Sequence, residues 1–240
     1  MYNQNYNDGM RYDMQQRAAQ QLTSTVSGTM KRVYFKMTLA LLVTAFTALF
    51  CAGSQSYVNF AITNSWWMWL LIIAEFGLVI GISAGINKLS NMAASGLFYL
   101  FAVVNGLMLW TIFFAYSPTA IIKTFFITAG TFGAMSVYGY FTQRDLSRIG
   151  SYLFMALIGL IIASLVNIFL HSSTLDWIVS IAGVAIFVGL TAWDTQQIKN
   201  MAMAAPADSL GRLATLGALS LYLDLINLFL YLLRIFGNRD

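Results

Sequence analysis

The sequence predicts an all-α polytopic membrane protein with seven transmembrane helices. Of its 240 residues, 59% are hydrophobic and only 9% are charged, whereas a soluble domain carries about a quarter charged residues. Apolar runs of roughly 17 residues or more recur along the chain, and each is long enough to cross a hydrocarbon core of about 30 Å. The alternating segments of about ten residues that mark a membrane β-barrel are not visible, so the spans are predicted to be helices.

The scarce residue types exclude other classes of protein. Cys51 is the only cysteine and His171 the only histidine, which excludes an intramolecular disulfide framework and a zinc site built on thiolates. The net charge of +4 is explained by the topology of a membrane chain rather than by nucleic acid, which is not an expected partner. The lipid bilayer is the expected partner, and no resident cofactor is expected.

The first 30 residues are polar and rich in Asn, Gln and Tyr. They lack the apolar core of a secretory signal peptide, and their composition predicts a mobile N-terminal tail. The sequence therefore divides into this tail, residues 1–30, and a seven-helix membrane domain over residues 31–240. The domain opens with a cationic cluster of Lys31, Arg32 and Lys36.

Seven apolar spans follow, separated by polar or helix-breaking residues. Pro118, within "YSPT", marks the break between the third and fourth spans because proline cannot extend a helix. Trp66, Trp67 and Trp69, at the start of the second span, are typical of a belt at the membrane interface. The predicted spans are about 37–53, 66–86, 93–116, 120–141, 151–170, 177–195 and 211–235.

The lysines and arginines predict the orientation of the chain. With the N-terminus inside, ten of them fall in inner segments, and three, Lys123, Arg234 and Arg239, fall in outer ones. Because cytoplasmic segments carry the excess of Lys and Arg, the N-terminus is predicted to be cytoplasmic. A re-entrant last span would return the C-terminus to the inside, so the side of the C-terminus stays open.

Three acids lie within the predicted spans: Glu75, Asp194 and Asp224. A charged acid at the centre of a lipid-exposed helix costs about 2.5–3.5 kcal/mol, so such residues face the bundle interior and are functional candidates by default. For Glu75 two interpretations stay open. It either hydrogen-bonds a neighbouring helix or lines the same polar interior as the two aspartates.

Three other polar residues follow Asp224 on the same predicted helix. Asn227, Tyr231 and Arg234 follow it at i+3, i+7 and i+10, so these polar groups share one helical face. Such a stripe on an otherwise apolar helix indicates a central helix that lines a polar interior. The alternative is a hydrogen-bond ladder that only locks the packing of helices.

Asp194 lies near the inner end of its span, where the negative end of the helix dipole disfavours an acid by about 0.3–1 kcal/mol. A bonding partner should therefore stabilise the Asp194 carboxylate, unless that carboxylate is solvated at the cytoplasmic surface. If Asp194 and Asp224 approach within hydrogen-bonding distance they cannot both ionise cheaply, and they share one proton. Such a pair senses pH and, when deprotonated, offers hard oxygen ligands to Ca²⁺.

Asp194 is expected to lie ~10 Å nearer the inner surface than Asp224, and helix tilt or a deeper last span must close that gap.

Two segments around these acids carry a family resemblance. "GLTAWDTQQIK" (189–199) and "ALSLYLDLINLFLYLLRIFG" (218–237) resemble the signature segments of the transmembrane Bax inhibitor motif family, and "AEFGLVIGISAGINKLS" (74–90) is similar to its second span. The resemblance implies a last helix ringed by the other six. It also implies that Asp194 and Asp224 form a di-aspartyl pH sensor gating a calcium leak, in a bacterial inner (plasma) membrane.

The second span departs from the pattern that the resemblance implies. In bacterial relatives with a calcium-leak role, a basic residue of this span latches onto the acid equivalent to Asp194. Here the corresponding region has Gly85 and Ile86, and Lys88 is the nearest cation. A latch, if one forms, would have to use Lys88.

The sequence thus leads to a pH-sensitive calcium (cation) leak channel as the predicted function. The resemblance also implies an alternative, because some bacterial relatives are associated with a membrane-anchored, ATP-dependent quality-control protease of the FtsH type: a non-conducting regulator that binds such a protease through the N-terminal tail. Catalysis is not expected, because neither Asp194 nor Asp224 is followed by the GxGD-type signature of intramembrane aspartyl proteases. Ca²⁺, held by Asp194 and Asp224, is expected to bind only transiently.

Overall fold

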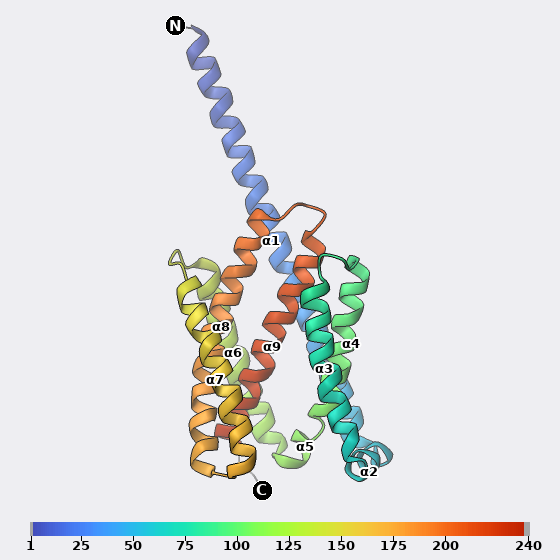
Figure 1. Ribbon diagram of the computed structural model, residues 1–240. Helices are drawn as coiled ribbons and strands as arrows, with labels where there is room; N and C mark the ends of the chain where they lie inside the picture. Colours follow the sequence, from blue (N-terminus) through green and yellow to red (C-terminus); the bar gives the residue numbers. More distant parts are fainter. Residues whose placement is uncertain (1, 238–240) are drawn as a thin grey trace.

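The computed structural model describes residues 2–237, with the side chains of residues 13–17 and 19–237. Within that range the chain is helical and contains no strand, and its helices form one bundle (Figure 1). The helices are α1 (Tyr2–Gly53), α2 (Gln55–Thr63), α3 (Ser65–Gly85), α4 (Asn91–Leu109), α5 (Ile112–Ala115), α6 (Pro118–Phe141), α7 (Ser147–Leu170), α8 (Ser173–Ala204) and α9 (Leu210–Phe236).

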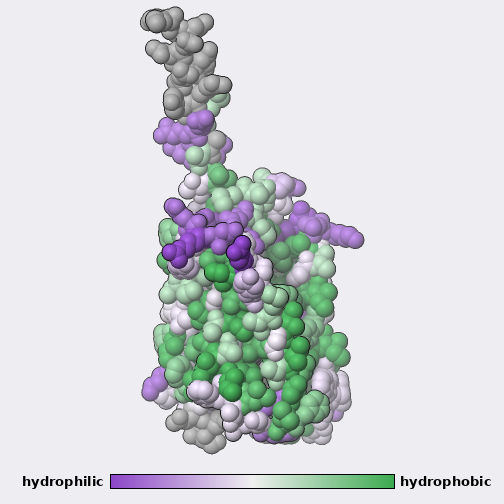
Figure 2. All heavy atoms as spheres, turned by 60° about the vertical axis from the view of Figure 1, so that its left-hand side comes forward, coloured by the Kyte–Doolittle hydropathy of each residue, from purple (hydrophilic) through white to green (hydrophobic). Residues whose placement is uncertain are grey.

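The predicted number of spans is confirmed. Seven segments of the described chain are long and apolar enough to cross a membrane, and all but the α4–α5 segment lie within a single helix. Apolar side chains cover the flank of the bundle, and hydrophilic ones gather at the end where α1 enters (Figure 2). The spans are Asp13–Gly53, Ser65–Gly85, Asn91–Ala115, Pro118–Phe141, Ser147–Leu170, Ser173–Ala204 and Leu210–Phe236.

The helix α1 continues without a break from the predicted tail into the first span. Its N-terminal part stands clear of the bundle (Figure 1), and the described side chains from Asp13 to Ser24 are exposed. Burial begins at Val26 and continues through Met30 and Val33, the spacing of one helical face. The predicted tail is therefore helical from Tyr2 onward, and its mobility stays a prediction.

Besides the predicted tail, two further stretches outside the predicted spans are helical. The short helix α2 occupies the first predicted loop, and α8 continues to Ala204, past the predicted end at residue 195. Polar residues extend α8 because they find partners outside it. Gln196 bonds to the backbone of the loop between α6 and α7, and Lys199 Nζ donates to the carbonyl of Tyr140 at the end of α6.

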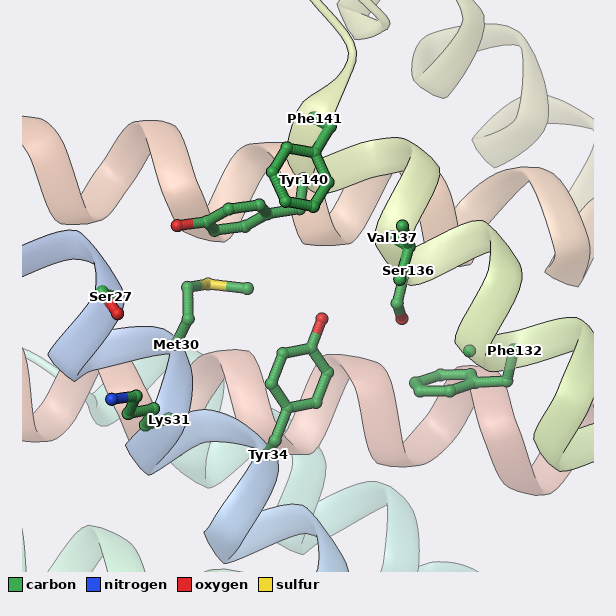
Figure 3. Close-up of a pocket in the computed structure, with 10 residues that line it drawn as sticks. Ser27, Met30, Lys31, Tyr34, Phe132, Ser136, Val137, Tyr140 and Phe141 are labelled. Atoms are coloured by element: carbon green, nitrogen blue, oxygen red, sulfur yellow. The ribbon is translucent and has the colours of Figure 1, made fainter. Parts of the chain in front are cut away.

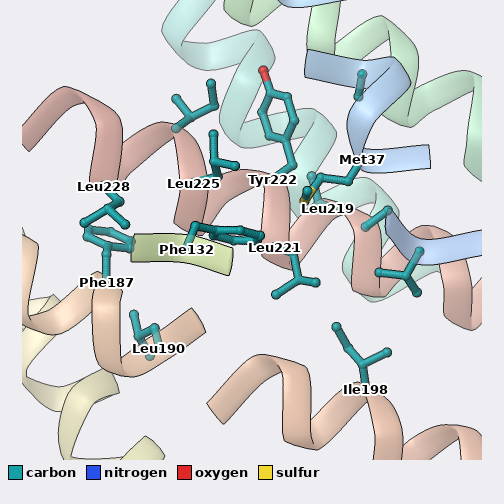
Figure 4. Close-up of a cluster of buried hydrophobic side chains, with 14 of the residues drawn as sticks. Met37, Phe132, Phe187, Leu190, Ile198, Leu219, Leu221, Tyr222, Leu225 and Leu228 are labelled. Carbon is teal, nitrogen blue, oxygen red and sulfur yellow. The ribbon is translucent and has the colours of Figure 1, made fainter. Parts of the chain in front are cut away.

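The last helix, α9, is the most buried of the described spans. It packs against α1, α3, α4, α6 and α8, whereas α7 packs mainly on α8. Its side chains Leu221, Tyr222 and Leu228 belong to one buried cluster with Phe132 of α6 and Phe187 of α8 (Figure 4). The complete ring of six helices around α9 stays a prediction.

Candidate functional site

Asp194 of α8 and Asp224 of α9 lie on adjoining antiparallel helices. Ile198 packs against Gly217, and from that contact Asp194 lies four residues and Asp224 seven residues farther into the bundle. The difference of three residues is about 4.5 Å along the helix axis, well below the ~10 Å expected from the sequence. The gap closes because α8 continues beyond the predicted membrane boundary, which places Asp194 deeper in the bundle.

The carboxyl groups of Asp194 and Asp224 face each other and are close enough to share a hydrogen bond. Asp224 is only 4% exposed, and Asp194 is partly exposed. Because an ionised carboxylate has acceptor atoms only, a hydrogen bond between the two carboxyl groups requires a proton on one of them. The structure thus brings together the two acids that the sequence singles out.

Among the described side chains, neither Asp194 nor Asp224 forms an ion pair with Lys or Arg. Within the described chain Asp224 Oδ2 is also buried without a hydrogen-bond partner. The hydroxyls of Thr191 and Thr195 donate to carbonyls of their own helix. Since an uncompensated buried charge is costly, a shared proton that removes one of the two charges suits this environment.

The predicted companions of Asp224 on α9 have other partners. Asn227 Nδ2 donates to the carbonyl of Leu223, one turn earlier on the same helix, at 2.8 Å. Tyr231 stacks on Phe187 with ring centroids 5.9 Å apart. The Arg234 guanidinium lies 5.4 Å from the centroid of the Tyr231 ring.

Arg234 also connects α9 to the start of α8. Its Nη1 lies 3.7 Å from Asp176 Oδ1, and both side chains are more than a third exposed. An ion pair with this exposure contributes about 0–1 kcal/mol to the stability of the folded protein. Tyr231 and Arg234 therefore lie at the end of the α8–α9 contact opposite to the one where α1 enters (Figure 1), and they make no hydrogen bond with Asp224.

Glu75 belongs to a different polar network from that of the two aspartates. Its Oε1 accepts a hydrogen bond of 2.7 Å from Asn105 Nδ2. The Tyr222 hydroxyl donates to Asn105 Oδ1 at 3.1 Å and lies 2.6 Å from Thr44 Oγ1, which donates to the carbonyl of Ala102. This chain of hydrogen bonds joins α3, α4, α9 and α1.

Lys88 is not brought to the aspartate pair. It lies exposed in the turn that follows α3, and its backbone N–H bonds to Gly85. Lys36, which the sequence predicts only as part of a basic cluster, is a half-buried cation that reaches into the bundle. Lys36 Nζ donates to Ser95 Oγ at 2.7 Å and to Thr215 Oγ1 at 2.6 Å, linking α1, α4 and α9 near one end of the bundle.

The two aspartates are the only acids at this site in the described chain, where no group of three or more His, Cys, Asp or Glu side chains could hold a metal ion. Ca²⁺ takes six to eight oxygen ligands, so two carboxyl groups can supply only part of its shell.

Comparison with known proteins identifies the family of the chain. Residues 26–240 match the family described as "Inhibitor of apoptosis-promoting Bax1". The chain is 52% identical over 213 residues to the inner membrane protein YbhL of Escherichia coli, covering 88% of this chain and 91% of that one. It is 46% identical over 210 residues to an uncharacterized protein of Borreliella burgdorferi, covering 87% and 90%. A Rickettsia prowazekii protein is 43% identical over 211 residues, with 88% and 89% covered.

Proposed function

The chain belongs to the Bax inhibitor-1 family of membrane proteins, and from this premise we propose that it is a pH-sensitive cation leak channel, with Ca²⁺ as the cargo. The observation that carries the proposal is the close approach of the carboxyl groups of Asp194 and Asp224 at a site without a cationic partner among the described side chains. Such a pair has two states that differ by one proton.

The proton acts through the contact between α8 and α9. When it is present, the carboxyl–carboxyl hydrogen bond holds the two helices together at mid-bundle, and the pair carries one negative charge. When it leaves, two carboxylates face each other, repel, and present acceptor oxygens that a divalent cation can bind. Loss of the proton therefore both loosens the contact and creates a cation ligand, so cation passage increases as pH rises.

Calcium flux in proteoliposomes tests this function. Wild-type flux, measured from about pH 6 to about pH 8, is expected to rise with pH because the shared proton leaves as the pH rises. Asp194→Asn and Asp224→Asn should flatten that dependence, because an amide neither releases a proton nor supplies a charged ligand. Asp208→Asn, the same change in an exposed loop, is the matched control. A pH dependence that persists in both site variants contradicts the proposal.

The second candidate is a non-conducting regulator that binds a membrane-anchored, ATP-dependent protease. It is favoured by the exposed N-terminal part of α1, which stands clear of the bundle (Figure 1). The excess of cations at that end places the extension in the cytoplasm under this proposal. A chain that starts at residue 25 keeps the packed stripe from Val26 onward, so it should fold and lose the partner. Equal recovery of the protease by both chains contradicts this candidate.

A further inference from the structure

A groove of about 520 Å³ runs between α1 and α6 near the end of the bundle where α1 enters. Met30 and Tyr34 of α1 form one side of it, and Phe132 and Phe141 of α6 form the other (Figure 3). Gly133 of α6 also lines the groove, and a Cβ added there would meet no atom within 4 Å. The missing side chain leaves part of the groove open.

The groove lies between two membrane spans, so it faces the lipid bilayer. Both helices are membrane spans, and the groove follows the last ten residues of α6, from Phe132 to Phe141. Ten helical residues rise about 15 Å, which is about half of a hydrocarbon core of roughly 30 Å. The groove therefore matches the depth of one leaflet, as an acyl chain requires.

The polar groups at the groove are cationic or neutral. Lys31 is exposed at its edge and forms no ion pair among the described side chains. Figure 3 shows the Lys31 amine and the Tyr140 hydroxyl at the same end of the groove. Lys199 lies 5.4 Å from the centroid of the Tyr140 ring and adds a second positive charge there. No Asp or Glu lines the groove.

Hydroxyl groups in the groove are available to a ligand. The side-chain hydroxyls of Tyr34 and Tyr140 make no hydrogen bond within the described chain, and the Tyr34 hydroxyl points into the groove (Figure 3). A phosphate at the lysine end would therefore meet an ammonium group and a free phenol donor. These are the groups that recognise a phosphate ester.

We propose that this groove is a binding site for an anionic phospholipid, with one acyl chain between α1 and α6 and the phosphate beside Lys31 and Tyr140. A zwitterionic lipid can fill the apolar part but brings no net charge to the two lysines. The site is independent of ion conduction by the aspartate pair.

Native mass spectrometry of the full chain in detergent tests the proposal with phosphatidylglycerol and phosphatidylcholine. Wild-type protein is expected to retain phosphatidylglycerol preferentially, and Lys31→Gln should reduce that preference about fivefold, the effect of one lysine near a membrane surface. Lys88→Gln removes an equal charge from the same end of the bundle, outside the groove, and should leave the preference unchanged.

A second pair of variants tests the apolar part of the site. Gly133→Phe should fill the groove and lower the retention of both lipids. Gly130→Phe lies one turn away on α6, is equally free of neighbouring atoms and does not line the groove, so it should have no effect. The proposal is overturned if Lys31→Gln and Lys88→Gln change the preference equally, or if the two glycine variants retain lipid equally.

Discussion

Tyr222 and Asp224 point to opposite sides of α9, because two residues correspond to about 200° of helical rotation. Tyr222 joins Asn105 and Thr44 in the network that contains Glu75, whereas Asp224 faces Asp194. The last helix therefore carries two separate polar contacts. One holds α9 to α1 and α4, and the other holds it to α8.

Removing the Tyr222 hydroxyl should weaken the first contact and leave the second intact. Tyr222→Phe is expected to lower the free energy of unfolding by about 0.6–1.7 kcal/mol, from the average to the maximum found for interhelical hydrogen bonds in a membrane protein. Unfolding by a denaturing detergent, followed by circular dichroism, measures the change. Thr44→Val should be partly non-additive with it, because the two hydroxyls share one hydrogen bond; full additivity would exclude that coupling.

The close approach of α6 to α8 depends on a glycine. A Cβ at Gly139 would collide with the backbone of Ala192, so Gly139→Ala should lower the free energy of unfolding by about 1–3 kcal/mol. Gly130, on the same helix, has open space at its Cβ position. Gly130→Ala should therefore be neutral or should stabilise the helix by about 0.5–1 kcal/mol. Equal melting temperatures for the two variants would mean that the helices do not meet at Gly139.

The loop between α6 and α7 is held by one side chain of α8. Gln196 Oε1 accepts a 2.9 Å hydrogen bond from the Leu146 N–H, and its Nε2 donates to the carbonyl of Arg144 at 2.8 Å. Gln196→Ala leaves the buried N–H of Leu146 unpaired and should lower the free energy of unfolding by about 1–3 kcal/mol. Its neighbour Gln197 makes no side-chain hydrogen bond in the described chain, so Gln197→Ala is the control. Hydrogen exchange of the Leu146 amide should become faster only in Gln196→Ala.

The number and order of the spans could be predicted because hydropathy reports directly on lipid exposure. The family was predictable from the segments around Asp194 and Asp224, and the match over residues 26–240 confirms it. Hydropathy could not locate the end of α8, however. Gln196 and Lys199 are polar, yet they continue the helix because they bond to residues of α6 and the loop after it.

The partners within the bundle were the least predictable part of the site. Tyr222 bonds to Thr44, 178 positions earlier in the chain, and no local pattern reveals a contact of that kind. Asn227, Tyr231 and Arg234 do follow Asp224 at helical spacing, but spacing does not report which groups bond. The sequence predicts Lys36 only as one member of a basic cluster. Its partners, Ser95 and Thr215, lie on other helices, so the local sequence does not reveal them.

The proton shared by Asp194 and Asp224 is the central claim, and infrared difference spectroscopy of the protein in lipid tests it most directly. On raising the pH from about 6 to about 8, a protonated carboxyl band should disappear from the wild-type spectrum. The change should be absent from the Asp194→Asn/Asp224→Asn double variant and retained in Glu75→Gln. A band that disappears unchanged in the double variant, or a wild-type spectrum without one, would contradict the claim.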